Sequence, residues 1–204
     1  LQCAGSKVGT FTSPALVNRL DIIRVNDNPI DEATIVRYAN RYMDDWMAYE
    51  LSKFDIEVFI AVMYFIEQGV DIALFEVGLG GTLDATNIIS PILAVNTNIG
   101  LDHINFLGNT YASIARSKAG IIKRGIPYMT AERRPECLDV FYEEAHKHHS
   151  YVIEIRKPKR VYYGASISYD YHGYHISLST SAHYQVTNSA LAINILEYIR
   201  KEFP

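Results

Sequence analysis

Two mostly apolar runs, each about the length of a β-strand and each followed by a loop, place the strongest constraint on the fold of this chain. One run extends from Val70 to Val77 and leads into the glycine-rich segment Gly78–Gly81. The other, Ile92–Thr97, leads into the segment Asn98–His103. Continuous apolar runs are typical of parallel strands that are covered on both faces. They predict an α/β protein with central parallel strands.

Helical and extended segments alternate along most of the chain. Helices are predicted over Asp31–Glu50, Phe54–Gln68, Thr110–Ala119, Pro135–Ser150 and Val186–Lys201, and further strands over Lys7–Phe11, Pro127–Thr130 and Tyr151–Ile155. This β-α-β-α-β order predicts a mostly parallel open sheet with helices on both faces.

The pattern changes towards the C-terminus. Apolar and polar residues alternate over Val161–Ser179 around His172-Gly173, which predicts a small antiparallel β-hairpin. We therefore expect one domain over residues 1–204, with a parallel α/β part over about 6–156 and the hairpin and final helix as an appendage over about 157–204. Leu1–Gly5 reads as the last turn of a helix closed by a glycine.

The charge and the apolar runs exclude some classes of partner. The net charge of −4 gives no reason to expect nucleic acid or an anionic membrane surface. The longest apolar run, Val58–Ile66, is much shorter than the ~18 residues of a membrane helix. No signal-peptide pattern opens the chain. The expected location is the cytoplasm.

Glu76 ends the first apolar strand and precedes the glycines, where open α/β sheets bind their ligands. A carboxylate in this place commonly holds magnesium beside nucleotide phosphates. The alternative of a dinucleotide-binding G-x-G-x-x-G fails, because Leu83 or Thr82 stands where that pattern needs glycine. A glycine turn with a purely steric role stays open on this segment alone.

Two further residues are candidates whose significance is low when each is taken alone. His103 follows the second strand, and a neutral imidazole is a good metal ligand, although a lone histidine is more often structural. Lys118 lies late in a predicted helix, where a lysine is usually a solvated cation favoured by the helix dipole.

Taken together and in order, the motifs are far more specific. The succession T-S-P, E-V-G-L-G-G-x-x-D-A-T-N, G-L-D-H, L-G-x-T and I-A-x-x-K-A-G-I-I-K resembles the ATPase domain of folylpolyglutamate synthases, members of the Mur-ligase superfamily. The segment His183–Ala192 is similar to the family's H-Q-x-x-N-x-x-x-A, with one extra residue after the histidine. The resemblance runs from about Gly5 to the C-terminus.

The resemblance implies a P-loop-NTPase-like central domain of a ligase. In this family ATP phosphorylates the γ-carboxylate of a folate, and the amine of L-glutamate then displaces the phosphate. The implied substrates are ATP, L-glutamate and tetrahydrofolate or dihydropteroate, with Mg²⁺ as cofactor and a monomer as the usual state.

The resemblance also implies roles for individual residues. The expected catalytic residues are Glu76, His103 and Lys118, the last matching a lysine that relatives carry as a carbamate. Ser13 and Glu76 would hold one magnesium ion and His103 a second. Nucleotide contacts are expected from Ser13, Thr86, Asn87, Gln185 and Asn188.

Departures from the family pattern leave other interpretations open. Ala15 replaces a histidine, and Ile22 and Thr82 replace cationic residues. No G-x-x-x-x-G-K-[ST] loop occurs in these residues, so we expect a central piece that lacks this loop and the C-terminal domain and is inactive in isolation. A non-catalytic, ligand-binding paralogue is the main alternative.

A metal-binding module is a further, weaker alternative. His146, His148 and His149 lie near the end of a charged helix, where the dipole favours histidines and a solvated face is the better interpretation.

Overall fold

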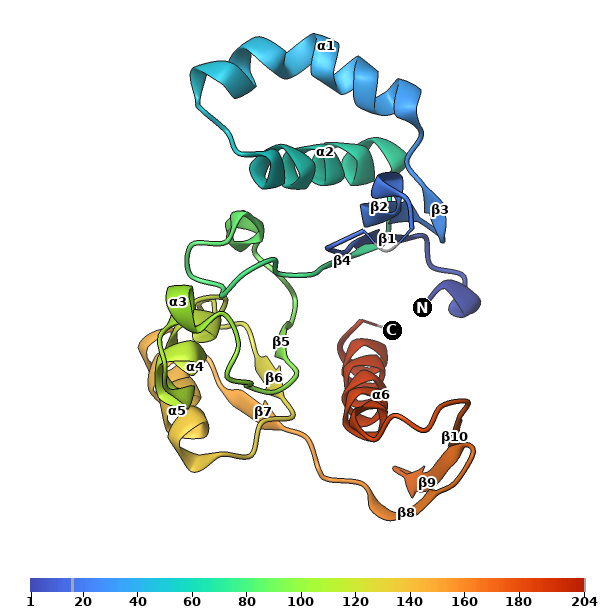
Figure 1. Ribbon diagram of the computed structural model, residues 1–204. Helices are drawn as coiled ribbons and strands as arrows, with labels where there is room; N and C mark the ends of the chain where they lie inside the picture. Colours follow the sequence, from blue (N-terminus) through green and yellow to red (C-terminus); the bar gives the residue numbers. More distant parts are fainter. Residues whose placement is uncertain (16, 204) are drawn as a thin grey trace. The chain divides into compact units, whose positions relative to one another are not determined.

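The computed structural model describes residues 1–15 and 17–203, which form two compact units, Leu1–Ile89 and Ser90–Pro204 (Figure 1). That the two together make one domain stays a prediction.

The first unit contains a four-stranded sheet in the order β3-β2-β1-β4. Its strands are β1 (Val8–Phe11), β2 (Ile23–Val25), β3 (Asn28–Pro29) and β4 (Ile72–Phe75). The pairing of β1 with β4 is parallel and aligns Phe11 with Phe75, whereas β2 pairs antiparallel with both β1 and β3. The predicted parallel strand is confirmed. In the described residues, however, β4 lies at the edge of the sheet with Ala73 and Leu74 exposed, so the predicted central position, covered on both faces, is wrong for this unit.

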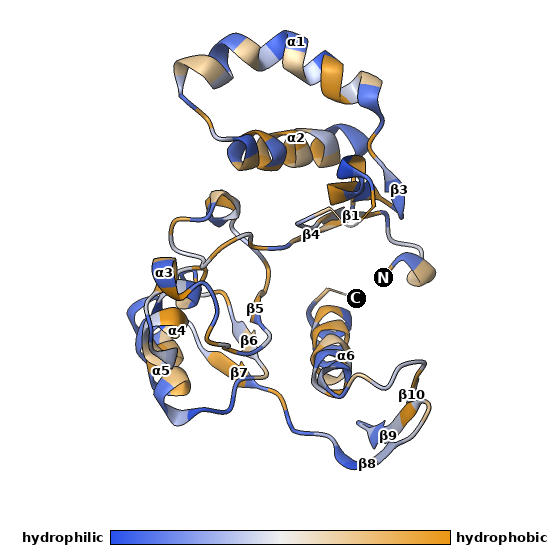
Figure 2. Ribbon diagram, viewed as in Figure 1, coloured by the Kyte–Doolittle hydropathy of each residue, from blue (hydrophilic) through white to orange (hydrophobic). Residues whose placement is uncertain are grey.

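Two helices complete the core of the first unit, the second packing against β1 and β2 and the first against the second. Helix α1 (Glu32–Ala48) is capped by Asp31, and α2 (Lys53–Gln68) by Ser52 in a capping box with Asp55. Helix α2 is mostly apolar along its length, while α1 carries hydrophilic residues between its apolar ones (Figure 2). The core includes Phe11, Ile23, Trp46, Ala61 and Phe65. Both helix predictions are thus confirmed within one or two residues at each end.

Hydrogen bonds from α1 to Glu67 join the two helices. The Tyr38 hydroxyl donates to Glu67 Oε2 at 2.6 Å, and Arg37 Nη2 donates to both carboxylate oxygens at 2.7 and 2.9 Å. Burial, followed by the nearby Glu67 carboxylate, raises the pKa of Tyr38 to about 12. The Tyr38 hydroxyl therefore stays protonated and keeps its role as donor.

Gly9 is the place where α2 comes nearest to β1. A Cβ atom at Gly9 would lie 2.9 Å from two ring carbons of Phe65, which is itself buried. We expect Gly9→Ala to lower the free energy of unfolding by about 1–3 kcal/mol, since the ring has no room to withdraw. Urea denaturation followed by the fluorescence of the single tryptophan, Trp46, measures this.

Gly164→Ala is the matched control for that substitution. Its Cβ would meet only the Ser166 carbonyl at 3.6 Å, an ordinary contact. An equal loss in both variants would show that the crowding at Phe65 is not the cause.

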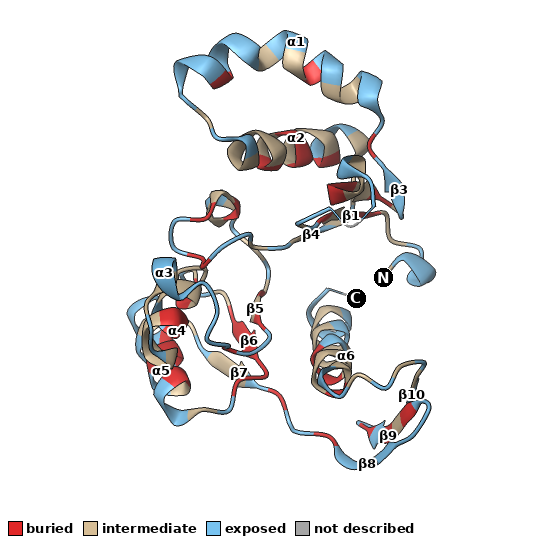
Figure 3. Cartoon of the chain, viewed as in Figure 1, coloured by how far each residue is buried: buried red, intermediate tan, exposed pale blue. Residues whose placement is uncertain are grey.

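The second unit is built on a three-stranded parallel sheet, β5-β6-β7. Its strands are β5 (Ala94–Asn96), β6 (Tyr128–Thr130) and β7 (Val152–Glu154), and all of β6 is buried (Figure 3). Tyr128 points into a core with α4 (Tyr111–Ala119) and α5 (Pro135–Lys147). Met129 points into the opposite core, with α6 (Tyr184–Glu202). The predicted parallel sheet with helices on both faces is confirmed in this unit.

The predicted hairpin is present as part of a small antiparallel sheet, β10-β9-β8. Its strands are β8 (Lys159–Tyr163), β9 (Ile167–Tyr171) and β10 (Tyr174–Leu178). His172 and Gly173 both have positive φ, 50° and 84°, as a two-residue hairpin turn of type I′ requires. The His172 ring stacks on Tyr171 and its Nδ1 contacts Glu197 of α6 at 2.7 Å.

Short helices complete the two units: η1 (Gln2–Ala4), η2 (Arg19–Ile22) and η3 (Ala85–Ile88) in the first, and α3 (Ile104–Leu107) in the second. Gly5 closes η1 with a φ of 97°, so the predicted helical turn and its terminal glycine are confirmed. None of the helices in the described part of the chain combines the length and hydrophobicity that spanning a membrane needs.

Candidate functional site

The parallel pairing of β1 with β4 brings Ser13 and Glu76 together. Both strands end at the same edge, and the Glu76 N–H continues the ladder by donating to the Phe11 carbonyl at 2.8 Å. The Ser13 N–H donates to Glu76 Oε2 at 3.1 Å. Glu76 is exposed, and within residues 1–15 and 17–203 its Oε1 accepts no hydrogen bond. An accessible carboxylate oxygen, next to a residue that carries a hydroxyl, fits the donor set of Mg²⁺.

The glycine-rich loop after Glu76 is organised by the carboxylate of Asp84. Oδ2 accepts the N–H groups of Gly78 and Leu79 at 3.0 and 2.9 Å. Oδ1 accepts both the N–H and the hydroxyl of Thr86. Asp84 is almost fully buried, and it caps η3. It therefore fixes the course of the loop and of the residues that follow it.

Asp84 belongs to the D-A-T-N segment that carries the family resemblance, but its role in the loop was not predicted from the sequence. A signal was available, because aspartate two residues before a backbone N–H is the usual start of an Asx turn or a helix cap.

Thr86 and Asn87, two predicted nucleotide contacts, have internal partners in the structure. The Thr86 side chain is buried and its hydroxyl donates to Asp84. The amide Nδ2 of Asn87 donates to the Thr82 carbonyl at 3.1 Å. Both residues thus stabilise the loop itself, and a contact with a nucleotide stays a prediction for each.

His103 lies in the second unit, at the end of the loop that follows β5. Its side chain is exposed, and its backbone adopts the left-handed conformation with a φ of 52°. Asp102 accompanies it: Oδ1 accepts the His103 N–H at 2.7 Å, and Oδ2 lies 3.8 Å from Nε2. An accessible imidazole with a neighbouring carboxylate is able to bind a divalent cation.

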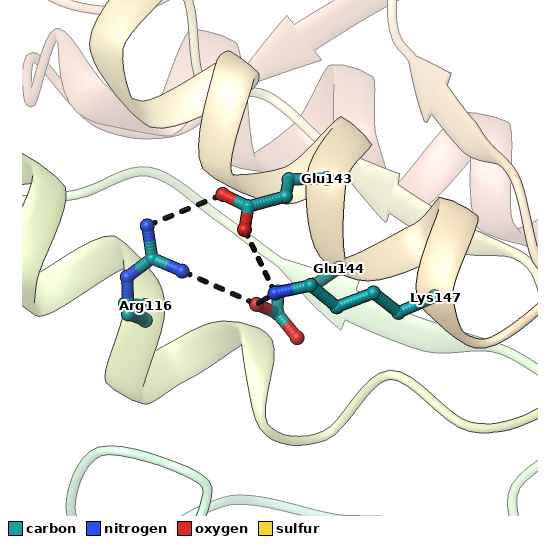
Figure 4. Close-up of polar contacts among 4 residues, drawn as sticks. All are labelled: Arg116, Glu143, Glu144 and Lys147. Carbon is teal, nitrogen blue, oxygen red and sulfur yellow. Dashed lines mark hydrogen bonds and ion pairs between the residues drawn. The ribbon is translucent and has the colours of Figure 1, made fainter.

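Lys118 lies in the last turn of α4, where it is half-buried. Its ammonium group forms no ion pair with any residue that the structure describes. Two residues earlier, Arg116 bonds to Glu143 and Glu144 of α5, both of which also contact Lys147 (Figure 4). This network holds α4 against α5 and leaves the amine of Lys118 available.

Gln185 and Asn188 lie in the first turns of α6, three positions apart and so on one face. Both are half-buried. In the described part of the chain neither side-chain amide forms a hydrogen bond to another residue. The two amides therefore keep their donors and acceptors for a ligand such as a purine ring.

The predicted metal ligands are divided between the two units, with Ser13 and Glu76 in the first and His103 in the second. Among residues 1–15 and 17–203, no three histidine, cysteine, aspartate or glutamate side chains gather as a metal site. The alternative of a module built from His146, His148 and His149 therefore gains no support.

The three departures from the family pattern differ in their surroundings. Ile22 is buried in the core of the first unit beside Ile23, so its side chain serves packing. Ala15 and Thr82 are exposed. The loss of a cationic side chain at position 22 is thus accommodated by the core.

The chain also matches a family of known proteins. Residues 48–196 match the Mur ligase middle domain. The chain is 44% identical to the dihydrofolate synthase/folylpolyglutamate synthase of Bacillus subtilis over 155 residues, which are 72% of this chain and 36% of that protein. It thus spans about a third of the length of this relative.

Solved structures of folylpolyglutamate synthases resemble this chain over nearly its whole length. A complex of folylpolyglutamate synthase with AMPPCP and folate superimposes with a TM-score of 0.86 at 30% identity, covering 100% of this chain and 54% of that one. The bifunctional folylpolyglutamate synthase/dihydrofolate synthase of Yersinia pestis, complexed with AMPPNP and Mn ion, gives 0.79 at 26% identity, covering 97% and 48%. The predicted α/β fold and the predicted family are both confirmed.

Proposed function

This chain belongs to the Mur ligase family by its middle domain, and we propose that the protein carrying it is an ATP-dependent ligase that adds L-glutamate to a folate. The observation that carries the proposal is the Ser13–Glu76 pair beside a loop ordered by Asp84. It lies in a chain that superimposes along its full length on a folate- and nucleotide-bound relative. We also propose the cytoplasm as its location and Mg²⁺ as the metal.

The proposed reaction has two steps. The γ-phosphoryl group of ATP passes to an oxygen of the folate γ-carboxylate, giving an acyl phosphate and ADP. The amine of glutamate then attacks the acyl carbon, and phosphate leaves as the nitrogen loses a proton, giving the γ-linked amide. Positioning and charge neutralisation supply most of the catalysis in such transfers.

The residues of the chain have distinct tasks in this proposal. Glu76 and Ser13 hold a divalent cation at the carboxyl ends of β1 and β4, and His103 holds a second. Bound magnesium would neutralise the charge that develops on the phosphoryl oxygens. Gln185 and Asn188 orient the adenine. Lys118 acts as a carbamate, formed when its neutral amine adds CO₂ and loses a proton.

ADP release by the protein of the complete reading frame tests the proposal. We expect release that needs both a folate and glutamate, and a comparison of tetrahydrofolate with dihydropteroate identifies the pterin substrate. A folded protein that binds ATP and a divalent metal but releases no ADP would contradict the proposal in favour of a non-catalytic paralogue, an outcome that the departures at Ala15 and Thr82 would then explain.

A further inference from the structure

We propose that Glu132 and Arg134 are positioning residues for His103, because together they fix the loop between β5 and α3 that carries it. This inference rests on the proposed function, in which His103 binds a divalent cation. Neither residue lies in the motifs that carry the family resemblance. Both lie in the segment directly after β6.

Glu132 is a buried carboxylate at the centre of several hydrogen bonds. Its side chain is only 2% exposed. Oε2 accepts the Ile99 N–H at 2.6 Å, and Oε1 accepts the N–H groups of Arg133 and Arg134 at 2.7 and 2.8 Å. Arg134 Nη1 lies 3.1 and 3.0 Å from the two oxygens. One carboxylate thus joins the segment after β6 to the loop after β5.

Arg134 provides the second tie to the same loop. Its Nη1 donates to the Ile99 carbonyl at 2.8 Å, so both backbone groups of Ile99 are bound from this side. Its guanidinium also lies over the Tyr111 ring, 4.2 Å from the centroid. Tyr111 opens α4, the helix that carries Lys118. The pair therefore connects the His103 loop to that helix.

The Ile99 side chain is fully buried in the core with α4 and α5, so the residue is held by its side chain, its N–H and its carbonyl together. His103 lies four positions further on in the left-handed conformation, with a φ of 52°. A non-glycine residue keeps such a backbone only where its surroundings define it closely. The three contacts that hold Ile99 define the course of the loop that leads to His103.

The negative charge on Glu132 helps it to hold the loop. Burial alone would raise the pKa of this carboxyl, but the N–H groups of Arg134, Ile99 and Arg133 and the Arg134 charge outweigh it and lower the pKa. Glu132 is therefore an anion at neutral pH. An apolar side chain of similar size would fill the space but could not accept a hydrogen bond from the Ile99 N–H.

The test uses Glu132→Gln in the protein of the complete reading frame. The variant keeps the size of the side chain but presents an amide N–H₂ to groups that are themselves donors. We expect hydrogen exchange of the Ile99 amide, followed on peptides covering residues 97–108, to accelerate about tenfold. Titration of Mn²⁺ by electron paramagnetic resonance should show about 10–100-fold weaker binding at the site that His103→Ala removes.

Tyr128→Phe is the matched control. Tyr128 is fully buried in β6, and its hydroxyl has no hydrogen-bond partner in the described residues. Its removal should change neither the exchange of residues 97–108 nor Mn²⁺ binding. If Glu132→Gln fails to fold, Arg134→Lys replaces it, since this side chain is 37% exposed. The lysine keeps the charge but lacks the planar guanidinium that lies over Tyr111, so both effects should recur in the same direction.

Two outcomes would overturn the inference: unchanged exchange of residues 97–108 in a folded variant, or faster exchange with unchanged Mn²⁺ affinity. A different result identifies a failure of the proposed function instead. If His103→Ala removes no Mn²⁺ site, the metal role of His103 is wrong, and the exchange data alone then decide whether Glu132 fixes the loop.

Discussion

Replacing Glu76 with glutamine is expected to lower kcat for ADP release by about 10²–10³-fold in the protein of the complete reading frame. Glutamine keeps a carbonyl oxygen that can accept the Ser13 N–H, which lies 3.1 Å from Glu76 Oε2. The ends of β1 and β4 therefore stay in place. What is lost is the negative charge that would hold the cation.

Glu67→Gln is the control for this charge change. Glu67 is an exposed carboxylate of the same unit, paired with Arg37 on the surface. Its substitution should leave kcat within about twofold, because the glutamine oxygen can still accept the hydrogen bonds from Tyr38 and Arg37 and the exposed ion pair itself contributes little. A kcat for Glu76→Gln within about threefold of the wild-type value would rule out Glu76 as a metal ligand in catalysis.

Asp84→Ala is expected to lower the free energy of unfolding of the first unit by about 3 kcal/mol. Hydrogen bonds to a charged group contribute about 1.5–3 kcal/mol each. Water can replace part of the bonds at Gly78 and Leu79, because both are exposed. Thr86, by contrast, is buried, and its N–H and hydroxyl would both lose Asp84 Oδ1 as acceptor.

Urea denaturation followed by Trp46 fluorescence measures this loss, since Ala85 packs against the core that contains Trp46. Asp84→Asn should fall between the two proteins, because its amide oxygen can still serve Thr86 while its N–H₂ opposes Gly78 and Leu79. A midpoint for Asp84→Ala equal to that of the wild-type protein would show that the carboxylate does not organise the loop.

Local patterns were sufficient to predict most of the elements. Helix α2 was predicted from its apolar run, and the β9–β10 turn from His172-Gly173. Asp84 and Glu132, whose roles were not predicted, are both buried carboxylates. Asp84 acts locally, on N–H groups two to six positions away, whereas Glu132 acts over a long separation. Glu132 binds an N–H 33 positions away, and no spacing rule connects two such residues before the fold brings them together.

The candidate site was predicted by resemblance more than by physical pattern. The family resemblance placed Ser13 and Glu76 at one magnesium ion, and the structure adds the hydrogen bond that joins the two residues. For Thr86 it shows a buried hydroxyl already used by Asp84, which the family pattern could not reveal. Roles for His103, Lys118, Gln185 and Asn188 stay predictions, because they depend on ligands.

The pairing of β1 with β4 also costs chain entropy. The Ser13–Glu76 contact closes a loop of 63 residues, whereas the bond from Thr12 to Ile22 beside it joins residues only ten apart. Closing the longer loop costs about 1.6 kcal/mol more chain entropy. The strand pairing that holds Glu76 is therefore a costlier closure than the bond between Thr12 and Ile22. Helices α1 and α2 lie between the two strands in the sequence, and their packing offsets that entropic cost. The geometry around Glu76 therefore depends on this packing.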